Sequence, residues 1–298
     1  MVNKKIKRNL GIIDKSLKEQ QLSTISDVLE KIIKVISDPK SSAKDLARIY
    51  ETDHTSSANL LRIANSAYYN VAGIYVDNIR IAIVRVGYKT AQEIVMAATV
   101  CDLFKDETLI GDYSRRDLWK NSMAVAIAAR IIYTDRFKSD ESYPFLAGLL
   151  RNIGIVLLDQ FLHTYGFRDA ISDRFENGTM LVEEERKYLG ITHEEIAGEL
   201  AEKWNFSNEL KYIMTNHHTM GKEVDKKLER LVDVIRLSEL MCFNIELGYS
   251  DFPESYKEAL SISQEKLGIN DTALYSLQNS LSDEVDKLKE SKWFLKNG

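Results

Sequence analysis

The scarcity of turn-forming residues is the feature that most constrains the fold of this chain. Its 298 residues include only three prolines and fourteen glycines, and a β-sandwich or barrel needs far more frequent turns. Between residues 24 and 37 the apolar side chains recur every three or four positions, the period of an amphipathic helix: Ile25, Val28, Leu29, Ile32, Ile33 and Ile36. Because no segment alternates strictly between apolar and polar residues, we predict an all-α fold.

Polar stretches and capping signals divide the helices into two groups. The polar stretch 105–113 separates a group within 20–104 from a second group within 114–247. In the second group, one helix is expected over 143–161, and another begins at His193 because Glu195 follows Thr192 at capping-box spacing. The prediction is a compact body of two packed helical subdomains, with extensions at 1–19 and 248–298.

The last predicted helix has one apolar face. That face suits either docking on the same chain or binding a partner helix, and docking on the same chain is favoured. Its apolar residues are Leu274, Leu277, Leu281, Val285 and Leu288.

The composition narrows the class of protein. The formal net charge is −5, so the broad positive field that nucleic-acid binding needs is missing and we expect no nucleic-acid partner. Cys101 and Cys242 lie in apolar runs and are expected to be buried thiols in a reducing compartment, with no disulfide. The basic N-terminus precedes no signal-peptide core, and no run approaches the ~18 apolar residues of a membrane span. We therefore expect a cytoplasmic protein without membrane contact.

Common catalytic motifs are missing. The chain has no phosphate-binding glycine loop, no nucleophile elbow and no cysteine pairs at zinc spacing. Of the five histidines, the adjacent His217 and His218 lie near the end of a predicted helix and are interpreted as capping groups. His193 follows a helix N-cap and is interpreted as an exposed first-turn residue.

Two segments carry a family resemblance. Residues 60–69 read Leu-Leu-Arg-Ile-Ala-Asn-Ser-Ala-Tyr-Tyr, and residues 78–87 read Asn-Ile-Arg-Ile-Ala-Ile-Val-Arg-Val-Gly. With 118–126, 145–154, 185–198 and the His217-His218 pair in order behind them, the chain resembles the HDOD domain family, a relative of the HD phosphohydrolases. The resemblance covers about residues 20–245.

The resemblance implies that a metal site has been lost. HD hydrolases hold metal ions with a histidine, a His-Asp doublet, further histidines and a late aspartate, and the metal activates a water. The matching positions in this chain are Asn121, Arg151, Asn152, His193, His217 and Glu239. An arginine offers no lone pair, and a neutral asparagine binds hard cations weakly. We therefore expect no metal and no cofactor.

Two positions admit two interpretations each. Arg151 either lies in the former metal pocket, holding a phosphate or pairing with Glu239, or it points into solvent; the second is favoured because charged residues are seldom buried. The segment Asn65, Ser66, Tyr68 and Tyr69 either ends a helix and fixes the adjoining loop, which is favoured, or forms a recognition surface.

These observations lead to a functional hypothesis. We expect a non-enzymatic regulatory module of a bacterial signalling system that acts by binding a protein partner, with a nucleotide or other phosphate-bearing ligand as a further candidate signal. The alternative is a metal-dependent phosphohydrolase whose site is rebuilt from Glu239, His193 and His217 with Asp159 or Glu194.

Overall fold

The computed structural model describes residues 2–16, 28–35, 38, 40–105, 109–110, 112–138, 143–218, 225–250, 252 and 258–290. Over these residues the chain is built from α-helices, and the all-α prediction is confirmed. The one small sheet in the described part pairs β1 (Leu109–Ile110) with β2 (Tyr113–Ser114) in antiparallel fashion. Three of its four residues lie inside the polar stretch 105–113 that was expected to separate the two helical groups, and Ser114 directly follows it.

The two-stranded sheet divides the helices into an earlier and a later set along the chain. Before the sheet they are α1 (Val2–Ser16), an unlabelled helical segment at residues 28–35, α3 (Ala43–Thr52), α4 (His54–Ala64), α5 (Ile79–Val86) and α6 (Tyr88–Val100), followed by a 3-10 turn at Cys101–Phe104. After the sheet they are α7 (Arg115–Phe137), α8 (Tyr143–Leu150), α9 (Ile153–Leu162), a 3-10 turn at His163–Tyr165, α10 (Phe167–Asn177), α11 (Leu181–Leu189), α12 (His193–Lys203), α13 (Asn208–Asn216), α14 (Lys226–Asn244), α15 (Glu258–Leu267) and α16 (Asp271–Glu290).

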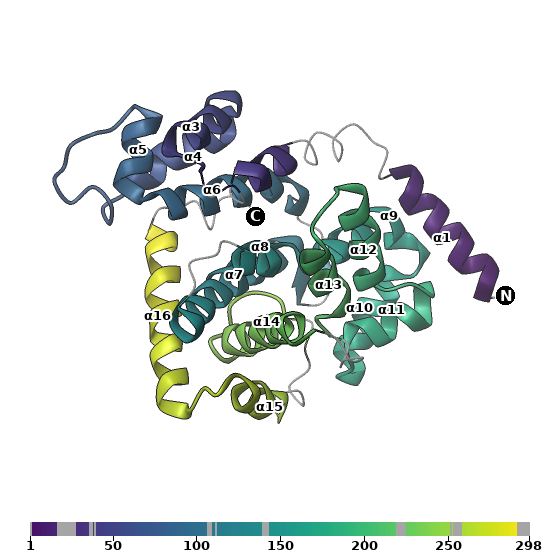
Figure 1. Ribbon diagram of the computed structural model, residues 1–298. Helices are drawn as coiled ribbons and strands as arrows, with labels where there is room; N and C mark the ends of the chain where they lie inside the picture. Colours follow the sequence, from purple (N-terminus) through teal and green to yellow (C-terminus); the bar gives the residue numbers. More distant parts are fainter. Residues whose placement is uncertain are drawn as a thin grey trace.

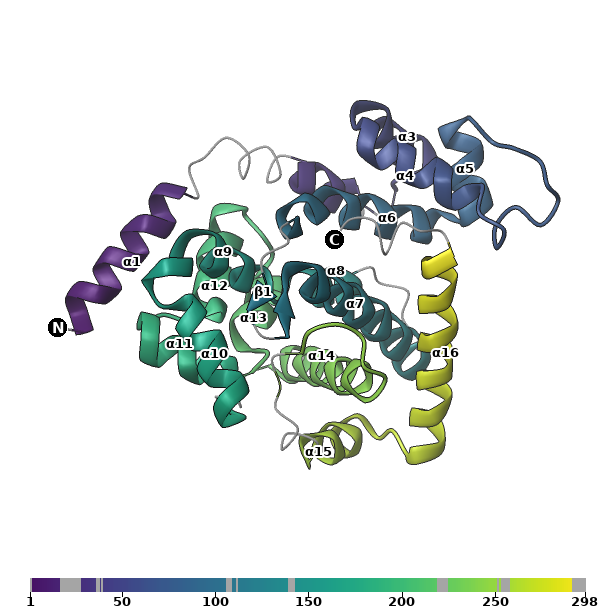
Figure 2. The same cartoon turned by 180° about the vertical axis from the view of Figure 1, so that it is seen from behind.

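The helices form two groups around a central pair (Figure 1). Helices α3 to α6 pack on one another and form one end of the molecule, while α9 to α13 form the other end. Between them, α7 packs against α8 and α14. The view from behind in Figure 2 shows α1 along the outer edge of the second group, where it contacts α9 and α11.

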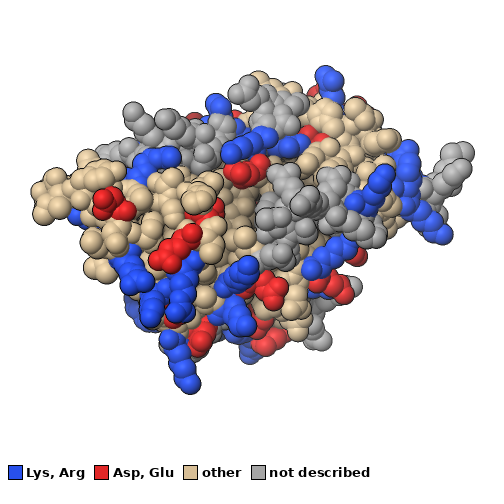
Figure 3. Space-filling model, turned by 90° about the horizontal axis from the view of Figure 1, so that it is seen from above, with Lys and Arg blue, Asp and Glu red and all other residues tan. Residues whose placement is uncertain are grey.

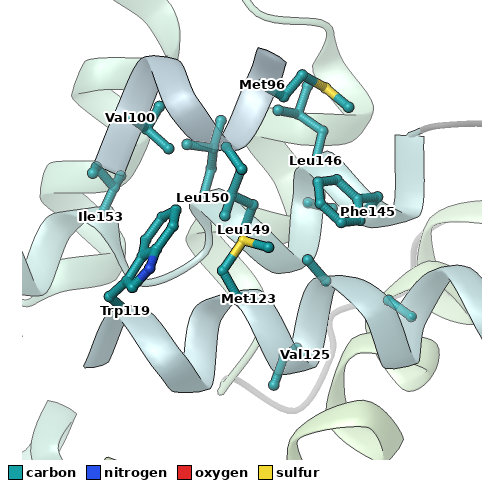
Figure 4. Close-up of a cluster of buried hydrophobic side chains, with 14 of the residues drawn as sticks. Met96, Val100, Trp119, Met123, Val125, Phe145, Leu146, Leu149, Leu150 and Ile153 are labelled. Carbon is teal, nitrogen blue, oxygen red and sulfur yellow. The ribbon is translucent and has the colours of Figure 1, made fainter. Parts of the chain in front are cut away.

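A dry core joins the two groups. Figure 4 shows side chains of α6, α7 and α8 meeting in one cluster. Trp119 and Leu149 are 0% exposed, and Phe145 is 1% exposed. Burial of such side chains stabilises the fold by roughly 1.5–3 kcal/mol each. This core holds α7 and α8 rigidly, and both helices carry residues of the site described below.

Local signals set several helix ends. The Thr192–Glu195 capping box is present: Glu195 N donates to Thr192 Oγ1 at 3.3 Å, and Thr192 N donates to the Glu195 carboxylate at 3.0 Å. Helix α11 ends at Gly190 with φ of 75°, a left-handed conformation that glycine adopts without strain. That turn folds α11 back against the first turn of α12.

The single helix expected over 143–161 is wrong. The chain breaks at Arg151 and Asn152, so α8 ends at Leu150 and α9 begins at Ile153, with Asn152 at its N-cap position. The apolar run continues through this break because nearly all residues of both helices are buried, so no change of period marks the boundary. The predicted helix over 24–37 is helical at 28–35; residues 24–27, 36 and 37 lie outside the described part.

The expected docking of the last helix on its own chain is confirmed. Helix α16 packs across α7 at an angle (Figure 1), and Leu277, Leu281 and Val285 of its apolar face are buried. The subdomain boundaries at 20–104, 114–247 and 248–298 stay a prediction.

One expectation about membranes needs correction. The segment Tyr143–Tyr165 is long and apolar enough to cross a membrane by length and composition, although no such run was expected. However, 89% of its most apolar window is buried inside the fold. This is consistent with the core of a soluble protein, and the compartment stays a prediction.

Candidate functional site

A buried arginine ties three helices together at the centre of the molecule. Arg151 follows the last turn of α8, and its side chain is 0% exposed. Its Nε donates to the Glu239 carboxylate of α14, and one Nη donates to the Asn121 side chain of α7. The other Nη donates to Gly148 O at 2.6 Å. Asn121 in turn donates to Leu247 O at 3.2 Å. The guanidinium therefore fixes α7, α8 and α14 relative to one another.

This burial shows that the solvent-exposed interpretation of Arg151 is wrong. The pocket interpretation, in which Arg151 pairs with Glu239, matches the structure. A cation tolerates burial when an opposite charge and directed acceptors replace its hydration, and Glu239, Asn121 and Gly148 supply them. The surroundings are dry: burial raises the pKa of the nearby Cys242 thiol, and the positive charge of Arg151 only partly opposes that rise.

His193 is also buried, so its expected exposure is wrong. It is 0% exposed, and so is Glu185 of α11 beside it. One Glu185 oxygen accepts from His193 N at 2.8 Å and lies 2.9 Å from His193 Nδ1. An ionised carboxylate only accepts hydrogen bonds, so Nδ1 carries the proton of this contact, and Nε2 offers a lone pair whenever the ring is neutral. The Gly190 turn brings Glu185 of α11 against the first residue of α12, a contact between two helices that N-cap spacing does not reveal.

His217 directs its Nε2 to the same point. Its Nδ1 lies 3.2 Å from Ile213 O, one helical turn earlier; a carbonyl oxygen only accepts, so Nδ1 is the donor of this contact. The Nε2 atoms of His193 and His217 are 3.4 Å apart, and Asn152 Oδ1 lies 3.0 Å from His217 Nε2. Asn152 Nδ2 is buried with no hydrogen-bond partner in the described part. The two Nε2 lone pairs and the Asn152 oxygen repel one another if nothing lies between them. A shared proton or a bound cation would remove this repulsion, and so would a rotated Asn152 amide that presents its NH₂ group.

The turn that carries the histidine pair is held from two sides. Arg236 of α14 donates from Nε to His217 O at 2.8 Å, and His218 N donates to Glu194 Oε1 at 2.8 Å. His217 occupies the C-cap position of α13, as the capping interpretation expected. Both rings are nevertheless buried and face His193, with centroid distances of 5.4 Å for His217 and 5.1 Å for His218.

The side chains present fit a metal centre made of the three histidines, but not the wider histidine-and-aspartate centre of the HD hydrolases. Among the described residues, the ligand atoms of His193, His217 and His218 lie within 4.8 Å of one another. Two nitrogens bound to a tetrahedral ion at about 2.05 Å lie about 3.3 Å apart, close to the 3.4 Å between the two Nε2 atoms. The wider histidine-and-aspartate set does not fit, because the Arg151 guanidinium already occupies Glu239 and Asn121.

A family model identifies the chain. The model of the HDOD domain matches residues 22–220. The chain belongs to the HDOD domain family. The family is related to the HD phosphohydrolases, as the resemblance implied. A search of curated proteins gave no match.

Solved structures share the fold of this HDOD protein. An HDOD domain protein of unknown function from Geobacter sulfurreducens superposes with a TM-score of 0.71 at 22% identity, covering 91% of this chain and 92% of that one. A "Putative phosphohydrolase" from Shewanella amazonensis gives 0.65 at 21% identity, covering 94% and 99%. A "Putative signal transduction protein" from Marinobacter aquaeolei gives 0.72 at 22% identity, covering 90% of this chain and 58% of that one.

The segment around Asn65 forms the hydrogen bonds expected if it ends a helix and fixes the adjoining loop. Asn65 ends α4, donates from Nδ2 to Val76 O at 2.6 Å, and accepts from Val76 N at 2.8 Å. Ser66 Oγ donates to Ile63 O at 2.7 Å. Tyr69 is half-buried, and desolvation raises its pKa to about 12. Tyr68 remains 43% exposed, and its role in recognition stays a prediction.

Two further residues shape the HDOD site without having been singled out from the sequence. Glu185 orients His193, and Gly154 lets α9 approach it: a Cβ at Gly154 would lie 2.0 Å from His193 O. Both residues lie within segments that carry the family resemblance, 145–154 and 185–198, but their roles follow from contacts between helices that the sequence does not show. Conversely, Asp159 pairs with Arg115 at 2.6 Å and with His163 at 2.9 Å, so its carboxylate is engaged in another network. Of the two carboxylates weighed for a rebuilt metal site, Glu194 is the one that contacts the histidine turn.

Proposed function

We propose that this HDOD protein is a non-enzymatic regulatory module of a bacterial signalling system that acts by binding a protein partner. The observation that carries the proposal is the buried pair of Arg151 and Glu239. A guanidinium at this place supplies the positive charge that a metal ion supplies in an HD hydrolase, but it cannot bind a water molecule and lower its pKa. Its donors already bond to Glu239, Asn121 and Gly148.

An exposed apolar surface supports the binding role. The loop between α4 and α5 projects from the end of the molecule (Figure 1), and Figure 3 shows that end, at the left, largely without charge. Farther along the same face, positive and negative side chains are interspersed. Large exposed apolar side chains gather on the loop and the adjoining face of α5: Val71 (89% exposed), Ile74 (65%), Tyr75 (75%), Ile81 (55%) and Val84 (78%). We call these five residues the apolar loop surface.

The base of the loop is held in place. Asn65 brackets Val76 with two hydrogen bonds, and Arg85 Nη1 donates to Ile74 O at 2.8 Å. A surface that is already ordered loses less conformational entropy when a partner binds. Exposed apolar patches of this kind are typical of protein interaction sites.

The test is affinity capture from the native host with the purified chain as bait. Wild type and Tyr75→Asp are compared with Tyr275→Asp, a matched control because Tyr275 is 68% exposed on α16. The proposal expects one partner to be retained by wild type and by Tyr275→Asp and lost with Tyr75→Asp. Equal retention by all three baits, or no stoichiometric partner, contradicts it.

The histidine cluster favours a second candidate, a metal-dependent phosphohydrolase. His193, His217 and His218 lie close enough to share an ion, and nitrogen ligands suit zinc and other transition metals. When bound, such an ion would activate water; Glu185 would fix the His193 ring, and Glu194 would hold the turn at His218.

Metal analysis and a phosphodiesterase assay separate the two candidates. The enzyme candidate expects one stoichiometric metal ion and hydrolysis of bis(p-nitrophenyl) phosphate, with both lost in His217→Ala. The regulatory proposal expects no turnover above background, with or without added zinc or manganese.

A further inference from the structure

A surface cavity lies beside the Arg151 and histidine site. A cavity of about 580 Å³ opens between α10 and the C-terminal end of α14. Aromatic rings form much of its lining, including Phe175, Phe243, Tyr249 and Phe252. Tyr249 and Phe252 are buried, with exposures of 4% and 2%, whereas Phe175 is half-buried. A flat apolar ligand would find several ring faces here.

A buried cation also lines this cavity. Arg174 of α10 is 8% exposed, and its guanidinium carbon lies 4.9 Å from the Phe175 ring centroid and 5.7 Å from that of Tyr249. Its Nη2 donates to Ser250 O and Phe252 O, both at 2.8 Å. Its Nε is buried and has no hydrogen-bond partner in the described part of the chain. A buried N–H group of a charged side chain without a partner is costly, and an anionic ligand would satisfy it.

The remaining charges on the lining limit what the anion can be. Asp112 and Glu246 also line the cavity, and both are exposed. Among the residues that the structure describes, Arg174 is the one cationic side chain on the lining, against these two carboxylates. A phosphate dianion or a polyphosphate would be repelled by the carboxylates. A carboxylate carries one charge and matches a single guanidinium.

We propose that this cavity, the Arg174 cavity, binds a small aromatic carboxylate. The carboxylate accepts from the guanidinium of Arg174, and the ring packs among Phe175, Tyr249 and Phe252. Asp112 and Glu246 favour an amine or another N–H donor on the end of the ligand that faces solvent.

The cavity wall is continuous with the Arg151 centre. Leu247 O, next to the lining residue Gly248, accepts from Asn121, which accepts from Arg151. Gly248 lies against α7 so closely that a Cβ there would be 2.2 Å from Asp117 O. The Phe252 ring lies 4.9 Å from the His218 ring. A ligand in the cavity therefore contacts the same rigid wall that holds the former metal site.

Calorimetric titration of the full chain tests the proposal. The probes are benzoate, phenylacetate and indole-3-acetate, with indole, inorganic phosphate and guanosine monophosphate for comparison. We expect at least one aromatic carboxylate to bind about tenfold or more tightly than indole, the gain from one charge-assisted hydrogen bond. No binding of any carboxylate at millimolar concentration overturns the proposal, and so does tighter binding of guanosine monophosphate or phosphate.

Variants then locate the site. Arg174→Gln should abolish carboxylate binding, and circular dichroism checks its fold because Arg174 also holds two carbonyls. Phe175→Ala removes a half-buried wall without touching those bonds and should weaken binding severalfold, whereas Glu246→Gln should strengthen it. The matched control Phe206→Ala, a half-buried phenylalanine outside the cavity lining, should leave binding unchanged. Unchanged affinity in both Phe175→Ala and Glu246→Gln places the carboxylate elsewhere and refutes the assignment.

Discussion

Replacing Arg151 by methionine should destabilise the protein severely. The change keeps much of the side-chain volume but leaves the Glu239 carboxylate, which is 1% exposed, without its cation. Removing one partner of a buried ion pair costs about 3–5 kcal/mol. That is a large fraction of the ~5–15 kcal/mol by which domains are stable. At roughly 2–4 °C per kcal/mol, the melting temperature should fall by roughly 6–20 °C.

The assay is urea unfolding followed by circular dichroism, with Arg116→Met as the control. Arg116 is exposed on α7, so its loss should change the free energy of unfolding by less than about 0.5 kcal/mol. The double variant Arg151→Met with Glu239→Leu removes both charges. Because a buried pair can be replaced by apolar groups at little cost, it should be more stable than Arg151→Met by about 2 kcal/mol or more.

Two results would refute this reasoning. If Arg151→Met loses less than about 1 kcal/mol, the guanidinium is not a buried partner of Glu239. If the double variant is as unstable as the sum of the two single variants, the side chains are not coupled. Should Arg151→Met fail to fold, Arg151→Lys keeps the charge but not the planar donor fork, and it should show a smaller loss of the same sign.

Three further changes have definite expected outcomes. Gly154→Ala should lower the free energy of unfolding by about 1–3 kcal/mol or more, seen as a lower urea midpoint, because the added methyl group would clash with His193 O; an unchanged midpoint would contradict that close approach. Burial raises the pKa of Cys101 to about 12 and raises that of Cys242 as well. The folded protein should therefore react with a disulfide reagent at neutral pH far more slowly than the urea-unfolded chain. Rapid labelling of the folded protein would argue against the burial of both thiols. Leu281→Ala should cost about 2–5 kcal/mol in the same unfolding assay, since Leu281 is 0% exposed, whereas a loss under 1 kcal/mol would mean that α16 is not docked.

The sequence by itself determined the fold class, the family and many helix ends. Helical periodicity and the Thr192–Glu195 capping box are local signals, because a helix forms its backbone hydrogen bonds within a few residues. The apolar face of α16 likewise predicted its docking correctly. The degenerate positions at Asn121, Arg151 and Glu239 were visible as residue types, although their mutual contacts were not.

Tertiary structure alone decided burial and pairing. Arg151 and His193 are charged or polar residues next to helix ends, and the local pattern predicts that such residues are exposed to solvent. Their actual partners, Glu239 and Glu185, are 88 and 8 positions away in the sequence and come into contact only when helices pack or reverse. The break between α8 and α9 escaped detection for a related reason: side chains buried on every face carry no periodic signal to mark where a helix ends. Whether a polar side chain is solvated or buried depends on its neighbours in space, and the spacing of residues along the chain does not specify those neighbours.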